Sequence, residues 1–470
     1  MLFNSIKYMI FLPIVFFIYW LLPHKYRKYL LLISSYYFYM SWNPIYILLI
    51  LSTTLISYIS GILLESRRNK KIIAFVGIFM SLSILIYFKY FNFLSSNITK
   101  ILELFTIKID PVMINVLLPV GISFYTFQTI GYLIDVYYGE AAERDFISYA
   151  TFVSFFPQLV AGPIERTKNL LPQLKQKHIF NYNQATYGIK LMLLGFFKKL
   201  VIADTLAIYV NQAFGNVINY SGFSLVLAVL FFTIEIYCDF SGYSDIAVGT
   251  AKLFGINLMT NFKSPYFSSS LKEFWNNWHI SLSTWFKDYV YIPLGGSRKG
   301  KFKTNVNLMI VFLLSGLWHG ASWTYIIWGF IHGTARIFEN IFLQKIKKIK
   351  WVNIIFVFTF CSFAWIFFRV ETLSDAIIVI KNMFIDIIHP FTYIKAGFSD
   401  LNISSNELIK IIMPIISLFI YDYVSLKIDI ISWISTRKTF VRWLIYVFVV
   451  FLILYLIPSS NTSEFIYFQF

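Results

Sequence analysis

The stretch from Lys272 to Gly333 reads KEFWNNWHISLSTWFKDYVYIPLGGSRKGKFKTNVNLMIVFLLSGLWHGASWTYIIWGFIHG. It holds three of the six histidines of the chain, namely His279, His319 and His332. His319 lies in an otherwise apolar run, where a titratable side chain is costly to bury and is therefore interpreted first as functional. We take residues 272–333 as the candidate catalytic core and the rest of the chain as the membrane body that holds it.

The composition is that of a membrane protein. Of the 470 residues, 58% are hydrophobic and 13% are charged, whereas soluble domains carry about 25% charged residues. The net charge of +17 comes from short basic clusters between apolar runs, a pattern typical of positive-inside topology signals and of contacts with anionic lipids. We expect an all-α, polytopic integral membrane protein that has membrane lipids, and not nucleic acid, as partners.

The apolar stretch from Tyr29 to Leu64 is too long for one span. Its 36 residues would form a helix of about 54 Å, against a hydrocarbon core of about 30 Å. Trp42, Asn43 and Pro44 interrupt it, and proline breaks helix continuity. We therefore predict two spans here, which return to one side of the membrane.

Further hydrophobic segments complete a single membrane domain over residues 1–470. The first segment, Met9 to Leu22, is interpreted as a retained anchor and not as a cleaved signal peptide. Thr151 to Pro163 is short and broken by proline and glycine, which favours a re-entrant element. Ser95 to Pro111 is expected to be a polar connection on the far side. In all we predict roughly eleven spans, including those at Ile72–Leu94, Val112–Tyr138, Ile189–Val210, Phe223–Phe240, Trp351–Phe368, Leu408–Val424 and Trp443–Ile457.

Phe274 to Tyr291 has aromatic residues at helical spacing with polar residues between them. This pattern predicts an amphipathic helix at the membrane interface. The basic loop from Arg298 to Lys303 follows and is placed in the cytoplasm. It is open whether this loop meets an anionic substrate or is an ordinary topology signal.

His319 is predicted to lie deep in the membrane. The basic residues Lys303 and Lys345 bracket a segment long enough for two spans that leave and return to one side. His319 is 16 residues from Lys303, or about 24 Å along a helix, near the turning point. Gly316 and Gly320 bracket it as G-x-x-x-G, a spacing that lets helix backbones approach closely.

Other side chains are candidates for substrate binding. Trp318 and Trp323 are candidate walls of a pocket, or members of an interfacial aromatic belt. Glu235 and Asp239 have i,i+4 spacing, and we expect them either to face a polar cavity or a cationic partner, or to belong to a network that stabilises the fold. The candidate substrate-binding residues are Trp318, Trp323, Trp278, Asp239 and Asp288.

Familiar hydrolase, nucleotide and metal motifs are missing from the sequence. It contains no H-E-x-x-H, no phosphate loop and no G-x-S-x-G. Cys238 and Cys361 lie in apolar surroundings and imply neither a disulfide framework nor a metal site. We expect no metal and no tightly bound cofactor. A buried histidine base without a nucleophile of its own suits direct transfer of an activated group to an incoming hydroxyl.

Several blocks resemble the membrane-bound O-acyltransferase (MBOAT) family, and within it the membrane subunits of bacterial alginate and peptidoglycan O-acetyltransferases. Together the blocks span most of the chain in order. They are FWNNWHISLSTWFKDYVYIPLGGSRKG from Phe274, NLMIVFLLSGLWHGASWTYIIWGFIHG from Asn307, PVGISFYTFQTIGYLIDVYYG from Pro119, FVSFFPQLVAGPIER from Phe152, YCDFSGYSDIAVG from Tyr237 and FIYFQF from Phe465.

The resemblance implies a role for His319 as the active-site residue and for His279 as a second functional histidine. It also implies helices arranged around a central funnel in the bacterial cytoplasmic (inner) membrane. The implied activity takes acetyl from cytoplasmic acetyl-CoA across the membrane, for O-acetylation of an exported envelope polysaccharide such as peptidoglycan or alginate. The implied partner is an extracytoplasmic transferase of the SGNH type.

Other functions remain open at this point. One is D-alanyl or other acyl transfer to teichoic acid from a carrier protein, although the segment PLGGSRKG resembles the acetyltransferase branch more closely. A transporter or flippase without chemistry is suggested by Asp135, Glu235 and Asp239 in apolar segments. A scaffold that only anchors an extracytoplasmic transferase is the third alternative.

Overall fold

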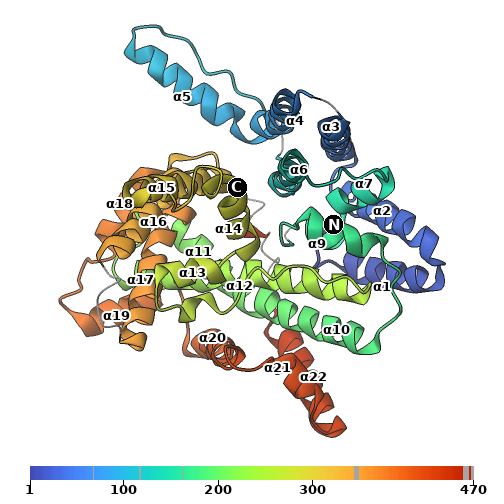
Figure 1. Ribbon diagram of the computed structural model, residues 1–470. Helices are drawn as coiled ribbons and strands as arrows, with labels where there is room; N and C mark the ends of the chain where they lie inside the picture. The colour runs from blue at the N-terminus through green and yellow to red at the C-terminus, as the bar shows by residue number, and fades with distance from the viewer. Residues whose placement is uncertain (67, 116–117, 161, 343–348, 459–464, 467–470) are drawn as a thin grey trace. The chain divides into compact units, whose positions relative to one another are not determined.

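A computed structural model describes the chain except for residues 67, 116–117, 161, 343–348, 459–464 and 467–470 (Figure 1). The described residues form helices and connecting loops, without a strand. They divide into two compact units. Unit 1 comprises Met1–Ile189 with Ala247–Met259, and unit 2 comprises Lys190–Ile246 with Thr260–Phe470. The predicted all-α class is confirmed, whereas the single domain over 1–470 stays a prediction.

Unit 1 confirms the helix break predicted at Trp42–Pro44. The Asn43 side chain accepts a hydrogen bond from the Ile45 backbone, and Pro44 opens a 3-10 turn. This combination ends one helix and starts the next because proline fits the first position of a helix but not its interior. The helices of unit 1 are α1 (Ile6–Leu21), α2 (His24–Met40), α3 (Ile47–Ser66), α4 (Lys70–Leu85), α5 (Phe91–Leu104), α6 (Ile122–Tyr137), α7 (Phe146–Ser154), α8 (Phe156–Leu159) and α9 (Thr167–Lys175).

Two boundaries in unit 1 differ from the prediction. The helix expected from Val112 begins only at Ile122. It follows Gly121, which has a φ of 76° and lies so close to Leu159 that a Cβ would be 2.5 Å from the Leu159 carbonyl oxygen. The polar connection expected from Ser95 is instead helical as far as Leu104, because its apolar residues recur at helical spacing.

The broken element predicted between Thr151 and Pro163 is confirmed as two short helices, α7 and α8, although α7 begins before it. The side-chain amides of Gln128 and Gln158 both donate to the Phe152 carbonyl oxygen, at 2.8 and 2.7 Å. These side chains satisfy backbone groups that the helix break leaves open.

Unit 2 carries the candidate core. Three tryptophans pack at its centre, with ring centroids 5.0 Å apart for Trp278 and Trp365 and 5.6 Å apart for Trp328 and Trp365. Its helices are α11 (Asp204–Phe214), α13 (Leu271–Asn277), α14 (Ile280–Phe286), α15 (Gly300–His319), α16 (Trp323–Phe342), α17 (Lys350–Arg369), α18 (Leu373–Asn382), α19 (Pro390–Asp400), α20 (Ser405–Ser425), α21 (Ile430–Ser435) and α22 (Thr439–Leu456), while α10 (Tyr182–Phe196) and α12 (Phe223–Leu253) contribute to both units.

Several helices are long and apolar enough to cross a membrane. Among the described residues six meet this condition by length and composition. They are Pro44–Ser66, Lys70–Leu104, Phe223–Leu253, Lys350–Arg369, Ser405–Ser425 and Thr439–Leu456. The chain is therefore a multi-pass membrane protein. The number of roughly eleven spans stays a prediction. That number included α1, which has 16 residues, and the hairpin of α15 and α16, and these helices are not among the six.

Candidate active site

His279 lies at a break between two short helices. The sequence predicted one amphipathic helix from Phe274 to Tyr291, and this prediction is wrong. α13 ends at Asn277, α14 begins at Ile280, and His279 between them has a φ of 42°. A left-handed backbone costs a residue with a Cβ roughly 1–2 kcal/mol. Such strain persists only where the surrounding structure fixes it, and it is frequent at functional sites.

A neighbouring loop fixes this break. The backbone N–H of Ile280 donates to the carbonyl oxygen of Asn261 at 2.9 Å, and the Ser281 hydroxyl donates to the Asn261 side chain at 2.6 Å. The Asn261 amide in turn donates to Ser244 of α12 at 3.0 Å. The backbone groups that the missing helical turn leaves open are thus satisfied by residues distant in sequence.

His319 is the last residue of α15, at the turn into α16. This confirms its predicted place near the turning point of the hairpin. The two helices touch through their backbones: a Cβ added to Gly316 would lie 2.2 Å from the Tyr325 carbonyl oxygen, and one added to Gly329 would lie 2.3 Å from that of Phe312. Glycines with this spacing permit close helix packing, which holds His319 one turn beyond the contact.

The structure brings the two predicted histidines together. The ring centroids of His279 and His319 are 6.5 Å apart, and both side chains are buried. Trp318 contacts both rings, at 5.8 and 5.0 Å. Phe240 packs edge-on against His279 at 4.5 Å. Burial lowers the pKa of His279 to about 3, so that its imidazole is neutral at physiological pH.

Both histidines line one cavity of about 1000 Å³ in unit 2. His279, Trp278 and Trp275 come from the α13–α14 break, and Ser315 and His319 come from the end of α15. The basic residues of the lining are Lys272, Lys287, Lys301 and Arg336, and no aspartate or glutamate occurs among the lining residues that the structure describes.

The cavity separates the predicted substrate-binding residues into two groups. Trp278 lines it, and Trp318 lies directly behind both histidines. Trp323 is 52% exposed and Asp288 is exposed, and neither belongs to the lining that the described residues form. Trp323 opens α16 beyond the turn, and Asp288 lies in the π-helical turn after α14, so neither faces this cavity.

Asp239 belongs to a buried ion-pair network. Its Oδ1 lies 2.6 Å from the Lys199 ammonium, and its Oδ2 accepts a hydrogen bond of 2.7 Å from the backbone N–H of Ile466. Lys199 also pairs with Asp204 at 2.9 Å. For this carboxylate the sequence left open a polar cavity, a cationic partner or a stabilising network, and the geometry is that of a cationic partner within a buried network.

The sequence analysis missed Arg336. This side chain lines the cavity and pairs with Glu339 at 3.0 Å. Glu339 also accepts hydrogen bonds from the backbone N–H groups of Leu271 and Lys272, at 2.8 and 3.1 Å, at the start of α13. The pair thereby ties the helix that leads to His279 to α16. An arginine in a largely apolar helix is itself a signal of function, and it was available in the sequence.

Comparison with known proteins identifies the family of the chain. Residues 140–373 match the model of the MBOAT, membrane-bound O-acyltransferase family. A probable alginate O-acetylase of Pseudomonas putida is 41% identical, over 82% of this chain and 80% of that protein. A peptidoglycan O-acetyltransferase of Helicobacter pylori is 34% identical over the same shares. A teichoic acid D-alanyltransferase of Bacillus subtilis is 31% identical, over 56% of this chain and 71% of that protein.

A polytopic helical protein with two buried histidines on one cavity fits a membrane-embedded transferase of activated groups. The chain belongs to the membrane-bound O-acyltransferase family, and it is an O-acyltransferase. The transporter and scaffold alternatives are thereby set aside as its main activity.

Proposed function

We propose that the protein transfers acetyl from cytoplasmic acetyl-CoA, for O-acetylation of an exported envelope polysaccharide such as peptidoglycan or an alginate-like chain. The observation that carries this proposal is the shared cavity. It joins two histidines to a lining with four basic side chains, Lys272, Lys287, Lys301 and Arg336. Such a wall suits a donor with several phosphate groups, since lysine and arginine are the usual phosphate partners.

In this proposal His319 acts as the general base. Its imidazole takes the proton from the acceptor hydroxyl while that oxygen attacks the thioester carbonyl carbon. A C–O bond forms, the C–S bond breaks, and the proton passes to the leaving thiolate of CoA. A positioned base of this kind contributes about 10² to 10⁴-fold. His279, 6.5 Å away between ring centroids, positions the donor or acceptor next to His319.

In this proposal the acetyl group reaches the polysaccharide through a partner, whose hydroxyl is the acceptor at His319. An extracytoplasmic transferase of the SGNH type receives the acetyl group and passes it to the polysaccharide, and the protein itself is placed in the bacterial inner membrane. The names of the relatives support a polysaccharide acceptor, because two of them act on alginate or peptidoglycan. The D-alanyltransferase relative covers less of this chain, which favours acetyl over D-alanyl as the transferred group.

The test is transfer from radiolabelled acetyl-CoA by purified protein in lipid vesicles, with the partner and glycan fragments present. Wild type and His319→Ala are compared, with His178→Ala as a control because His178 belongs to unit 1 and is not one of the residues that line this cavity. We expect label on the partner or glycan with wild type and with the control, and at least 10²-fold less with His319→Ala. Equal transfer by a folded His319→Ala protein would refute the role of His319. Label from a D-alanyl carrier protein, and none from acetyl-CoA, would refute the proposed donor.

A further inference from the structure

α5 is an amphipathic helix of unit 1 that the enzymatic function does not use. Its apolar residues Leu94, Ile98, Ile101 and Leu104 recur every three to four positions, and each is 43% exposed or more. None of the 14 residues of α5 is buried. An amphipathic helix normally covers its apolar face with protein or with lipid.

The length of the preceding helix shows where α5 lies. α4 has 16 residues and continues into a π-helical turn, Ile86–Tyr90, of five residues. Together they extend about 30 Å, which is the thickness of the hydrocarbon core. The whole stretch Lys70–Leu104 of 35 residues would be about 52 Å if straight. α4 and the π-helical turn are therefore long enough to span the membrane without α5, and α5 begins at the far interface.

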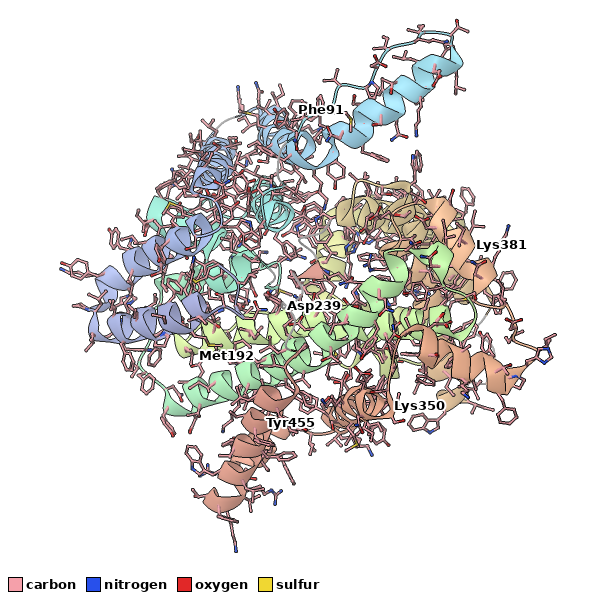
Figure 2. All side chains as sticks on the ribbon, turned by 180° about the vertical axis from the view of Figure 1, so that it is seen from behind. Phe91, Met192, Asp239, Lys350, Lys381 and Tyr455 are labelled. Atoms are coloured by element: carbon pink, nitrogen blue, oxygen red, sulfur yellow. The ribbon has the colours of Figure 1, made fainter. Side chains whose placement is uncertain are left out.

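The helix axis changes direction at the π-helical turn. Within unit 1, α3, α4 and α6 are seen almost end-on in Figure 1, whereas α5 is seen lengthwise and extends away from them. Figure 2 shows Phe91 at this corner. If α4 runs along the membrane normal, α5 lies close to the membrane plane. The aromatic residues at the corner fit the interfacial level of a bilayer; they are Tyr87, Phe88, Tyr90, Phe91 and Phe93.

The segment after α5 folds back along it. Thr106, with a φ of 64°, reverses the chain. The Asn92 side-chain amide then donates to the Ile114 carbonyl oxygen at 2.9 Å, and the Ile114 N–H donates to Asn92 at 2.8 Å. The returning segment adds further apolar side chains that are about half exposed or more, namely Ile107, Ile109, Val112 and Met113.

The charge of the surface formed by α5 and the returning segment differs from that of a docking site for a charged protein. The segment from Phe91 to Gly121 carries Lys100 and Lys108 against Glu103 and Asp110, so it has no net charge to recruit an acidic or basic partner.

The basic residues Arg68, Lys70 and Lys71 stand at the opposite end of α4, which places that end in the cytoplasm by the positive-inside rule. The α5 end is then extracytoplasmic.

We propose that α5 and residues 107–115 form an interfacial anchor that lies flat in the outer leaflet, with the lipid surface as its partner. The apolar stripe of α5 and the apolar side chains of the returning segment enter the boundary between headgroups and acyl chains. Lys100 and Glu103 face the water.

The test compares two neighbouring positions of α5 that lie about 100° apart around the helix axis, one within the apolar stripe and one outside it. Ile101→Cys and Lys100→Cys are labelled with an environment-sensitive fluorophore and reconstituted into phosphatidylcholine vesicles. Cys238 and Cys361 are fully buried, and the unsubstituted protein sets the background. We expect lipids brominated at carbons 6 and 7 to quench the Ile101→Cys label several-fold more than the Lys100→Cys label, and aqueous iodide to do the opposite. The pair Ile98→Cys and Thr99→Cys repeats the test if either first variant fails to fold.

Four outcomes would overturn the proposal. Equal iodide quenching at both positions would leave the apolar face in water, and protection that develops only with an added extracytoplasmic protein would make that protein the partner. Stronger quenching of the Ile101→Cys label by lipids brominated at carbons 11 and 12 would show a continuing span. Reaction of Lys100→Cys with an impermeant maleimide from the cytoplasmic side alone would place the anchor in the inner leaflet.

Discussion

His279 combines a left-handed backbone, with a φ of 42°, and a side chain that lines the cavity. These two properties are separable because asparagine and glycine tolerate this backbone and alanine does not. We predict that His279→Asn folds about as stably as the wild type and that His279→Gly is less stable, because it leaves a void beside Phe240 and Trp318. Both variants should transfer acyl groups about 10²-fold more slowly, as expected when reacting groups lose their positioning. Single-turnover rates and unfolding temperatures check this. Full activity in His279→Gly would mean that the backbone break, and not the imidazole, is what the site requires.

The stability of unit 1 depends on pH through the buried carboxyl group of Glu165. It is 2% exposed and accepts hydrogen bonds from the Met259 N–H at 2.5 Å and the Asn169 amide at 2.6 Å. Burial raises its pKa to about 7, from 4.5. Between these values the unfolded chain loses the proton while the folded protein keeps it, so stability falls as the pH rises.

We therefore predict that the protein loses roughly 2 to 4 kcal/mol of stability between about pH 4.5 and 7 through Glu165, at about 1.4 kcal/mol per pKa unit. Thermal unfolding in detergent across this range measures it, with Glu165→Gln as the comparison. The substituted protein should show a flatter dependence on pH. An unchanged slope in Glu165→Gln would assign the effect to other groups.

At the scale of elements, the contact between α15 and α16 determines where His319 lies. The added Cβ of Gly316→Ala would meet the Tyr325 carbonyl oxygen, a backbone atom that cannot move without shifting the helix. We predict a loss of about 1–3 kcal/mol and a lower transfer rate, since His319 follows one turn later. Leu314→Ala, two positions away and 40% exposed, is the control. Similar unfolding temperatures and rates in the two variants would argue against this packing role.

At the scale of the whole of unit 2, Asp239 links the two ends of the sequence of this unit. It pairs with Lys199 near the start and accepts a hydrogen bond from the backbone N–H of Ile466 near the end. Asp239→Asn leaves the buried Lys199 with Asp204 as its carboxylate partner and weakens the bond to the Ile466 N–H. Breaking a buried ion pair costs about 3–5 kcal/mol, so we predict a clearly lower unfolding temperature. Asp204→Asn should be comparably destabilised. Protease cleavage near Phe465 should increase only in Asp239→Asn, and equal cleavage in both variants would contradict the link to Ile466.

The sequence by itself determined the class of protein and the family, and it singled out His279 and His319 as candidate site residues. Hydropathy over 470 residues identifies a membrane protein because the bilayer requires long apolar helices. The break at Pro44 and the turn after His319 were also predictable, since proline and glycine act locally on the backbone. Each of these features depends on residues close together in the chain.

Only the tertiary structure decided which residues share the cavity. The backbone at His279 is set by Asn261, and aromatic periodicity alone predicts an unbroken helix there. Asp239 and Trp323 were equally plausible site residues until their contacts were known. The end of α5 at Leu104 and its direction depend on the π-helical turn before it. Local propensity cannot determine these features, because they result from packing between segments that are distant in sequence.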